Sequence, residues 1–150
     1  MNTVYSIDAG MLQELLDNNQ AIYKLLDIQD NDQQPYDKGL ERLSQWSFDA
    51  ISYHATLQQP GFMMLCLKVI TGNLSIKCLG IPLQPLLDFL KEIYSRMQNY
   101  TKSSQSAINL IDNLQILHYF LQVGNLKKYF SGADIFGLIL SFITYNLNNL

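Results

Sequence analysis

Residues 62–79, FMMLCLKVITGNLSIKCL, decide how the rest of this chain can fold. They are strongly apolar, they lie in the middle of the chain, and the turn signal at residues 71–73, Thr-Gly-Asn, divides them into two arms. If Gly72 and Asn73 form a two-residue turn, apolar residues alternate along both arms, which favours a β-hairpin. A buried helix over residues 62–71 is the alternative, because the periodicity of such a short apolar segment does not exclude it.

The segments before this stretch have apolar residues at helical spacing. Residues 11–26 carry one apolar stripe, which the polar residues 17–20 interrupt, so that two short helices are predicted. Residues 28–36, IQDNDQQPY, are predicted to form a polar loop. A longer helix is expected next, over residues 37–57, and the sequence Gln-Gln-Pro-Gly at residues 58–61 is expected to end it.

Three further helices are predicted after the central stretch. The first follows Pro85, a residue that suits the first turn of a helix. The second begins near Ser106 and ends near Gly124, and a short turn or helix covers residues 125–130. The sequence from Ser131 to Asp134 resembles a capping box and opens the last helix, which is apolar on most of its circumference. Such a helix is expected at the centre of a core or at an interface.

The fold class that these patterns predict is mostly α, with α+β as the alternative. Five or six helices would pack around a central β-hairpin at about residues 62–79, or around a buried helix in the same place. A length of 150 residues is typical of one domain, so residues 1–150 are expected to form a single compact domain.

Charge is scarce and unevenly distributed. Charged residues make up 15% of the chain, against about 25% in an average protein. Residues 1–60 carry nine acidic and three basic side chains, whereas residues 61–150 carry four acidic and seven basic ones. The acidic half could steer the protein toward a basic protein partner, although such a run also occurs as a solvated helix face. Nucleic acid is not an expected partner, because Lys127 and Lys128 form the one adjacent basic pair.

The compartment is predicted to be the cytoplasm. The two cysteines, Cys66 and Cys78, do not suggest a disulfide framework. The N-terminus has neither the basic nor the apolar region of a secretory signal, and the apolar segments are too short or too interrupted to span a membrane.

The sequence has no motif typical of catalysis. His54 and His118 each lie on an apolar helix stripe, where a buried structural histidine is the expected interpretation. Neither zinc-ligand spacings nor nucleophile or phosphate-binding motifs are present. Asp30 and Asp32 could approach a cation, but a calcium loop needs more ligands. We therefore expect no enzyme activity, no metal and no cofactor.

The function predicted from these features is protein binding by occlusion, as an immunity or inhibitor protein or as an effector chaperone or adaptor. A homodimer through the C-terminal helix is compatible with this function. The alternative is a small-molecule-binding regulatory domain with an apolar pocket between the last helix and the central stretch. Aromatic and acidic side chains are the expected contacts with the partner. The candidate partner-binding residues are Asp30, Asp32, Tyr36, Asp37, Glu41 and Trp46.

Overall fold

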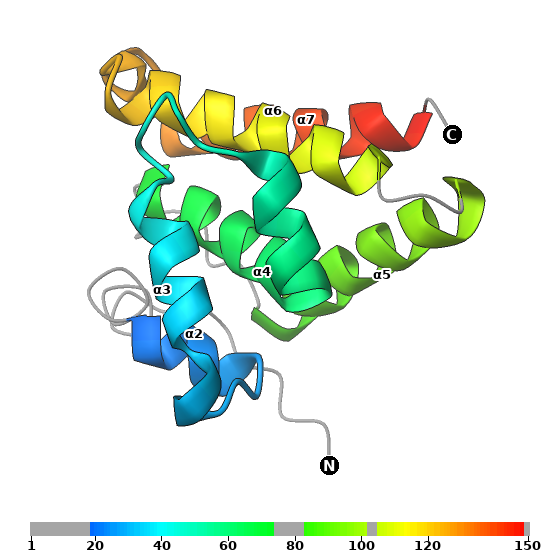
Figure 1. The fold of residues 1–150 in the computed structure, drawn as a ribbon. Helices are drawn as coiled ribbons and strands as arrows, with labels where there is room; N and C mark the ends of the chain where they lie inside the picture. The colour runs from blue at the N-terminus through cyan, green and yellow to red at the C-terminus, as the bar shows by residue number, and fades with distance from the viewer. Residues whose placement is uncertain (1–18, 74–82, 102–104, 149–150) are drawn as a thin grey trace.

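The computed structural model describes residues 19–73, 83–101 and 105–148, and the regular elements of these residues are all helices (Figure 1). The mostly helical fold predicted from the sequence is therefore confirmed. In chain order the elements are α2 (Asn19–Leu25), η1 (Asp30–Asp32), α3 (Gln34–Glu41), α4 (Ala50–Asn73), α5 (Leu83–Thr101), α6 (Gln105–Gln122), η3 (Leu126–Tyr129) and α7 (Gly132–Asn148).

The predicted β-hairpin is wrong, because residues 62–73 form the second half of α4. The buried-helix alternative describes this segment, while residues 74–79, the second arm, lie outside the described residues. The sequence did not distinguish helix from strand here because the segment is buried on every side. All side chains from Phe62 to Leu67 are at most 2% exposed, so this part of α4 has no polar face. An apolar segment without a polar face carries no periodicity from which helix and strand can be distinguished.

The helix predicted over residues 37–57 is divided into two, because α3 ends at Glu41 and α4 begins at Ala50. Asp49 caps the new helix, since its carboxylate accepts hydrogen bonds from the backbone N–H groups of Ile51 and Ser52, each at 3.1 Å. The break predicted at residues 58–61 is real but local. Gln58 has a non-helical backbone (φ 53°, ψ −141°), after which α4 continues in a new direction.

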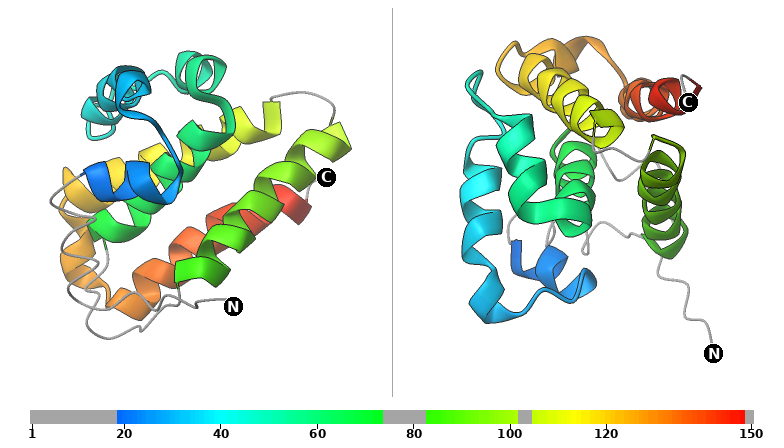
Figure 2. Two further views of the ribbon diagram at one scale, coloured as in Figure 1. Left: turned by 90° about the horizontal axis from the view of Figure 1, so that it is seen from below. Right: turned by 45° about the vertical axis from the view of Figure 1, so that its right-hand side comes forward.

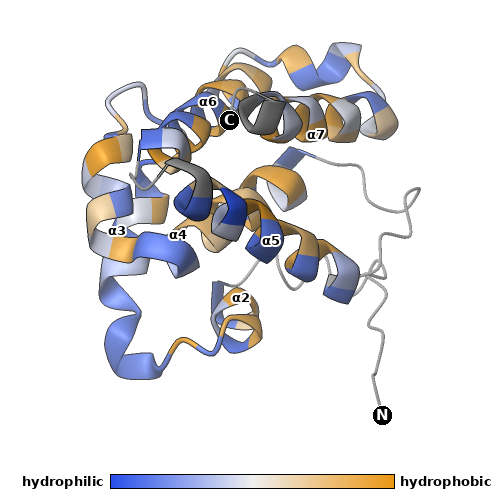
Figure 3. Cartoon of the chain, turned by 90° about the vertical axis from the view of Figure 1, so that its right-hand side faces the viewer, coloured by the Kyte–Doolittle hydropathy of each residue, from blue (hydrophilic) through white to orange (hydrophobic). Residues whose placement is uncertain are grey.

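Helix α4 lies at the centre of the molecule and packs against α3, α5, α6 and α7. Helices α6 and α7 lie side by side on one side of α4, and α5 runs close to both (Figure 2). Helix α5 is amphipathic, and its apolar and polar parts can be distinguished in Figure 3. Its buried residues are Leu86, Leu87, Leu90, Ile93, Tyr94 and Met97.

Helix α7 covers the core rather than forming its centre. Its fully buried stripe consists of Ile135, Ile139 and Ile143. On the exposed side, the hydroxyl of Ser141 donates a hydrogen bond to the Gly137 carbonyl at 2.7 Å, and the hydroxyl of Thr144 donates to the Leu140 carbonyl at 2.9 Å. The solvent face of α7 therefore includes two small residues whose hydroxyls bond back to the backbone, and it also carries the exposed ring of Tyr145.

Within residues 19–73, 83–101 and 105–148, no helix combines the length and the apolar character that crossing a membrane requires.

Candidate functional site

The segment between α3 and α4, residues 42–49, lies against α6 (Figure 1). It presents a tryptophan to solvent. The backbone of this segment is fixed to α6 by the buried side-chain amide of Gln115. This amide donates hydrogen bonds to the carbonyls of Leu43 and Gln45, each at 2.9 Å. The Leu43 side chain is buried in the core, whereas Trp46 is 68% exposed. The loop that carries Trp46 is thus fixed by tertiary hydrogen bonds and by one buried anchor.

Trp46 belongs to a cluster of aromatic rings at the surface. Its ring centroid lies 5.3 Å from that of Tyr119 and 6.4 Å from that of Phe120, and both contacts are edge-to-face. Phe120 is 45% exposed, and Val123, the residue that follows the end of α6, is 54% exposed. We name Trp46, Tyr119, Phe120 and Val123 the aromatic patch. The exposed apolar surface continues beside it into the η3 segment through Leu126, Tyr129 and Phe130.

The electrostatic surroundings of the aromatic patch are neutral to basic. The sequence contains no acidic residue from residue 113 to residue 133 or from residue 42 to residue 48. Lys127 donates a hydrogen bond from Nζ to Oε1 of Gln122 at 3.1 Å, and the Lys128 ammonium lies 5.0 Å from the ring centroid of Tyr129. The cations in this part of the molecule therefore adjoin aromatic and amide groups.

Beneath the aromatic patch, a buried polar network joins α6 to the end of α4. The amide Nε2 of Gln122 donates to Oδ1 of Asn73 at 2.9 Å and also to the carbonyl of Gly72. The C-terminal carbonyls of a helix lack partners within the helix, so these side chains complete the end of α4. The face of α6 opposite the aromatic patch is thereby fixed to the centre of the molecule.

His118 belongs to this network. Burial, together with the nearby ammonium groups of Lys127 and Lys68, lowers the pKa of its imidazole to about 4. Its Nε2 atom lies 3.4 Å from the hydroxyl oxygen of Ser44. The ring is therefore neutral at ordinary pH, and its contacts are those of a structural residue.

His54 and Cys66 are also enclosed by the core. The Nε2 atom of His54 lies 3.0 Å from the hydroxyl oxygen of Tyr94, and burial lowers the pKa of this histidine. Burial raises the pKa of the Cys66 thiol, which keeps the nucleophilic thiolate from forming. In the part of the chain that the structure describes, no three His, Cys, Asp or Glu side chains come together as a metal site.

The predicted acidic contact residues lie along η1 and α3. Asp30 and Asp32 are exposed on η1. Tyr36 is half-buried and packs edge-on against Tyr23, with 6.1 Å between the ring centroids. The carboxylate of Asp37 accepts a hydrogen bond from the Tyr23 hydroxyl, which ties this acid to α2.

Glu41 is exposed at the end of α3, and Trp46 follows in the loop beyond that end. The structure therefore places the acids of η1 and Trp46 at opposite ends of α3 (Figure 1). It does not gather the six predicted residues into one cluster. The contacts of Trp46 with Tyr119 and Phe120 were not predicted from the sequence. A signal was present, because Phe120 falls off the buried stripe of α6.

No protein-family model, curated protein or solved structure matches this chain. The function is therefore inferred from the aromatic patch and its surroundings. Two features matter most: a tryptophan held in solvent by a fixed loop, and the ring contacts that this tryptophan makes with α6.

Proposed function

We propose that this protein binds another protein through the aromatic patch and acts by occluding the surface to which it binds. The observation that carries the proposal is the 68% exposure of Trp46, the one tryptophan of the chain, on a loop that Gln115 fixes. Tryptophan and tyrosine dominate the binding energy of protein interfaces because they bury a large area while losing little conformational freedom. A fixed loop reduces this entropic cost further, since the ring is already held in place.

The charges around the aromatic patch define the partner that would fit it. Lys127 and Lys128 adjoin the patch and no acid lies nearby in the sequence, so a complementary surface would be an apolar depression with acidic residues at its rim. The acids of η1 would instead favour a basic group, as the sequence predicts. The eight residues of α3, which lies between the two regions, span about 12 Å, so one partner of ordinary interface size could contact both.

Within this class of function, two roles remain as proposals. An immunity or inhibitor protein would cover the active surface of a toxin, and a chaperone or adaptor would cover an apolar segment of an effector before its export. Both need a preformed contact surface, which the contacts of Trp46 with Tyr119 and Phe120 supply. The genomic neighbourhood separates them, because an adjacent toxin gene favours the first role and an adjacent effector gene favours the second.

Three sequence-based expectations stay predictions beside this proposal: the cytoplasmic location, the single domain over residues 1–150, and the homodimer through the C-terminal helix. The homodimer is tested by light scattering on the purified protein. Its predicted interface helix, α7, exposes the small residues Gly137, Ser141 and Thr144 and the larger ring of Tyr145. Small residues allow a second helix to approach closely but bury little apolar area.

The proposal is tested by affinity capture from the native host, followed by titration of each purified candidate partner. The matched variants are Trp46→Ser and, as a control, Tyr145→Ser. Tyr145 is 64% exposed and lies near the far end of α7. We expect Trp46→Ser to weaken binding by about 30-fold, the effect of losing a hot-spot residue, and Tyr145→Ser to leave it within about twofold.

Two results would overturn the proposal. One is a partner whose affinity is equally insensitive to both substitutions, which would place its binding site elsewhere. The other is the absence of any protein partner together with binding to vesicles of anionic lipid and a blue shift of Trp46 fluorescence. Exposed aromatic rings beside lysines also suit a membrane interface, so vesicle binding is measured in parallel.

A further inference from the structure

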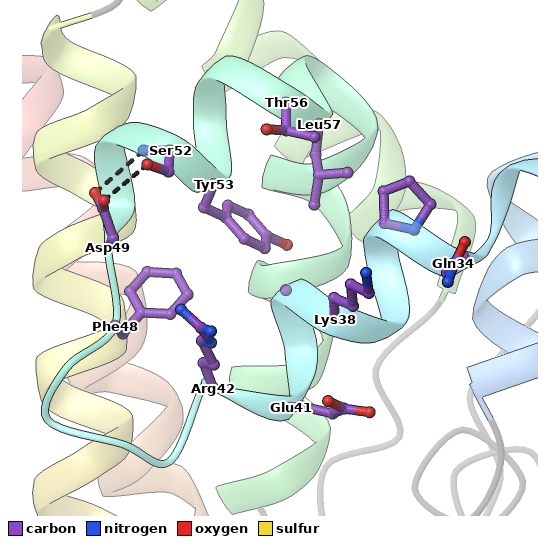
Figure 4. A pocket seen from close by; sticks show the side chains of 12 residues that line it. Gln34, Lys38, Glu41, Arg42, Phe48, Asp49, Ser52, Tyr53, Thr56 and Leu57 are labelled. Atoms are coloured by element: carbon purple, nitrogen blue, oxygen red, sulfur yellow. Dashed lines mark hydrogen bonds between the residues drawn. The ribbon is translucent and has the colours of Figure 1, made fainter.

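A cavity of about 610 Å³ lies between α3 and the first half of α4 (Figure 4). This volume falls within the range of small-molecule sites, about 300–1,000 Å³. The sequence-based alternative placed an apolar pocket elsewhere, between the last helix and the central stretch. The cavity is instead formed where the segment after α3 turns back, so that Phe48 stands across from the residues of α3.

The deep side of the cavity is apolar. The rings of Phe48 and Tyr53 pack with their centroids 5.3 Å apart, and Leu57 lies buried one turn further along α4. The Tyr53 hydroxyl donates a hydrogen bond to the Gly61 carbonyl at 2.6 Å, so this polar group is already satisfied. Gly39 brings the backbone of α3 close to the same ring, because a Cβ there would lie 2.8 Å from Cε2 of Tyr53.

The α3 side of the cavity carries two cations. Lys38 and Arg42 are four residues apart and therefore lie on the same face, and both line the cavity. Figure 4 shows the Arg42 side chain extending from the end of α3 toward Phe48. Among the described residues, neither cation forms an ion pair. A ligand can therefore approach both without displacing a carboxylate that neutralises them.

The two acids of the lining equal the two cations in formal charge, but neither forms an ion pair with them. The Asp49 carboxylate is engaged by the first turn of α4, since it accepts hydrogen bonds from the backbone N–H groups of Ile51 and Ser52 and from the Ser52 hydroxyl at 2.7 Å. Figure 4 shows the Glu41 carboxylate extending away from the space between Tyr53 and Arg42. The side chains that can contact a ligand are therefore the two cations at the rim and the apolar residues deeper in the cavity.

We propose that this cavity is a binding site for a small organic anion, with a carboxylate or sulfonate group on an aromatic or aliphatic body. The anionic group would bind between Lys38 and Arg42, and the apolar body would pack against Phe48 and Tyr53. Arginine suits this role because its planar guanidinium can pair with an anion while it stacks on a ring. The inference goes beyond the proposed function, since its ligand is a small molecule and its residues are not those of the aromatic patch.

The test uses 8-anilinonaphthalene-1-sulfonate, an aromatic sulfonate whose fluorescence rises in apolar sites, titrated into the full chain. The double variant Lys38→Gln with Arg42→Gln removes the proposed anion contacts. The matched control, Lys127→Gln with Lys128→Gln, removes two cations beside the aromatic patch. We expect the first pair to weaken binding by about tenfold and the second to leave it within about twofold. Urea denaturation confirms that both variants remain folded.

An uncharged analogue separates charge recognition from apolar binding. N-phenyl-1-naphthylamine lacks the sulfonate, so we expect it to bind the wild type about tenfold more weakly than the sulfonate. Equal binding of the two probes, or a loss of binding in the Lys127 and Lys128 variant instead, would overturn the inference. Amide chemical shifts give a second readout: the sulfonate should perturb Gly39 and Ser52 and leave Phe120 unchanged. None of these outcomes depends on whether Trp46 binds a protein.

Discussion

The Nδ1 atom of His118 lies 2.9 Å from the Nδ2 atom of Asn73, the last residue of α4. The amide nitrogen of Asn73 also donates to the carbonyl of Val69 at 2.7 Å, so Nδ1 of His118 must be the acceptor in this pair. The histidine proton therefore resides on Nε2, the atom that faces Ser44. This assignment joins α4, α6 and the Trp46 loop through neutral groups whose donors and acceptors match.

Replacing Asn73 by alanine should destabilise the protein by about 2 kcal/mol. The substitution leaves His118 Nδ1 without its donor in a buried site, and a buried polar group without a hydrogen bond costs about 1–3 kcal/mol. The Gln122 amide loses one acceptor but keeps the Gly72 carbonyl. Urea denaturation followed by circular dichroism measures the change. Asn109→Ala is the control, because Asn109 is exposed on α6 and should change stability by less than about 0.5 kcal/mol. Equal effects of the two substitutions would show that the network contributes no stability.

Stability should fall as the pH decreases from about 6.5 to about 4. The unfolded chain protonates His118 near its ordinary pKa of 6.5, whereas the folded protein holds this pKa at about 4. The unfolded state therefore binds more protons in this window, and the loss reaches up to about 3 kcal/mol at its acid end.

Denaturant unfolding at several pH values measures this slope, and His118→Gln should flatten it. His54, whose pKa burial also lowers, contributes a slope of the same sign that remains in this variant. Asp49 and Asp134 have pKa values lowered by their hydrogen bonds, so they add a loss of stability below the ordinary carboxylate range. If His118→Gln leaves the slope between about pH 4.5 and 6.5 unchanged, the assignment of this slope to His118 is contradicted. This window lies between the ordinary pKa values of a carboxylate, about 4, and of a histidine, about 6.5.

Two glycines on helices should respond in opposite directions to alanine. Gly137→Ala on α7 should stabilise the protein by about 0.5–1 kcal/mol, because nothing lies within 4 Å of the new Cβ and alanine favours a helix. Gly39→Ala on α3 should destabilise it by about 1–3 kcal/mol, because the new Cβ would lie 2.8 Å from Cε2 of Tyr53 and 3.2 Å from Cδ1 of Leu57. Thermal melting of both variants decides the matter. Stabilisation by Gly39→Ala would mean that α3 does not pack on α4 as described.

The two residues of the capping box of α7, Ser131 and Asp134, should stabilise the protein as a coupled pair. The Asp134 N–H donates to the Ser131 hydroxyl and the Ser131 N–H donates to the Asp134 carboxylate, each at 3.1 Å. Ser131→Ala should cost about 1 kcal/mol, and the double variant with Asp134→Ala should cost less than the sum of the single ones. Ser141→Ala is the control, since its hydroxyl bonds back within the helix and its loss should be nearly neutral. Additive effects would contradict a reciprocal cap.

The helices after the central stretch were predictable because their signals are local. Pro85 lies in the first turn of α5, and the pair Ser131 and Asp134 caps α7 as the sequence indicates. The turn at residues 125–130 is also present as η3. The left-handed residue after α6 is Asn125 (φ 54°) rather than Gly124, where a Cβ would lie 2.6 Å from the Phe120 carbonyl oxygen. Each of these features depends on residues a few positions apart.

Only one residue of the aromatic patch, Trp46, was among the partner-binding residues predicted from the sequence. Trp46 could be nominated from the sequence because tryptophan is rare and suits interfaces, but its ring partners are more than 70 positions away, at Tyr119 and Phe120. The loop position of Trp46 depends on the Gln115 amide, which the linear sequence does not connect with residues 43 and 45. Spacing along a chain carries no information about such distant contacts.

Helical content, the amphipathic face of α5 and the cap of α7 follow from short-range patterns, since propensity, periodicity and capping act within a turn or two of the backbone. The conformation of residues 62–73, the division between α3 and α4, and the assembly of the aromatic patch were settled by packing. A segment enclosed on all sides, such as Phe62 to Leu67, has no polar face to reveal its period, so its surroundings determine its shape.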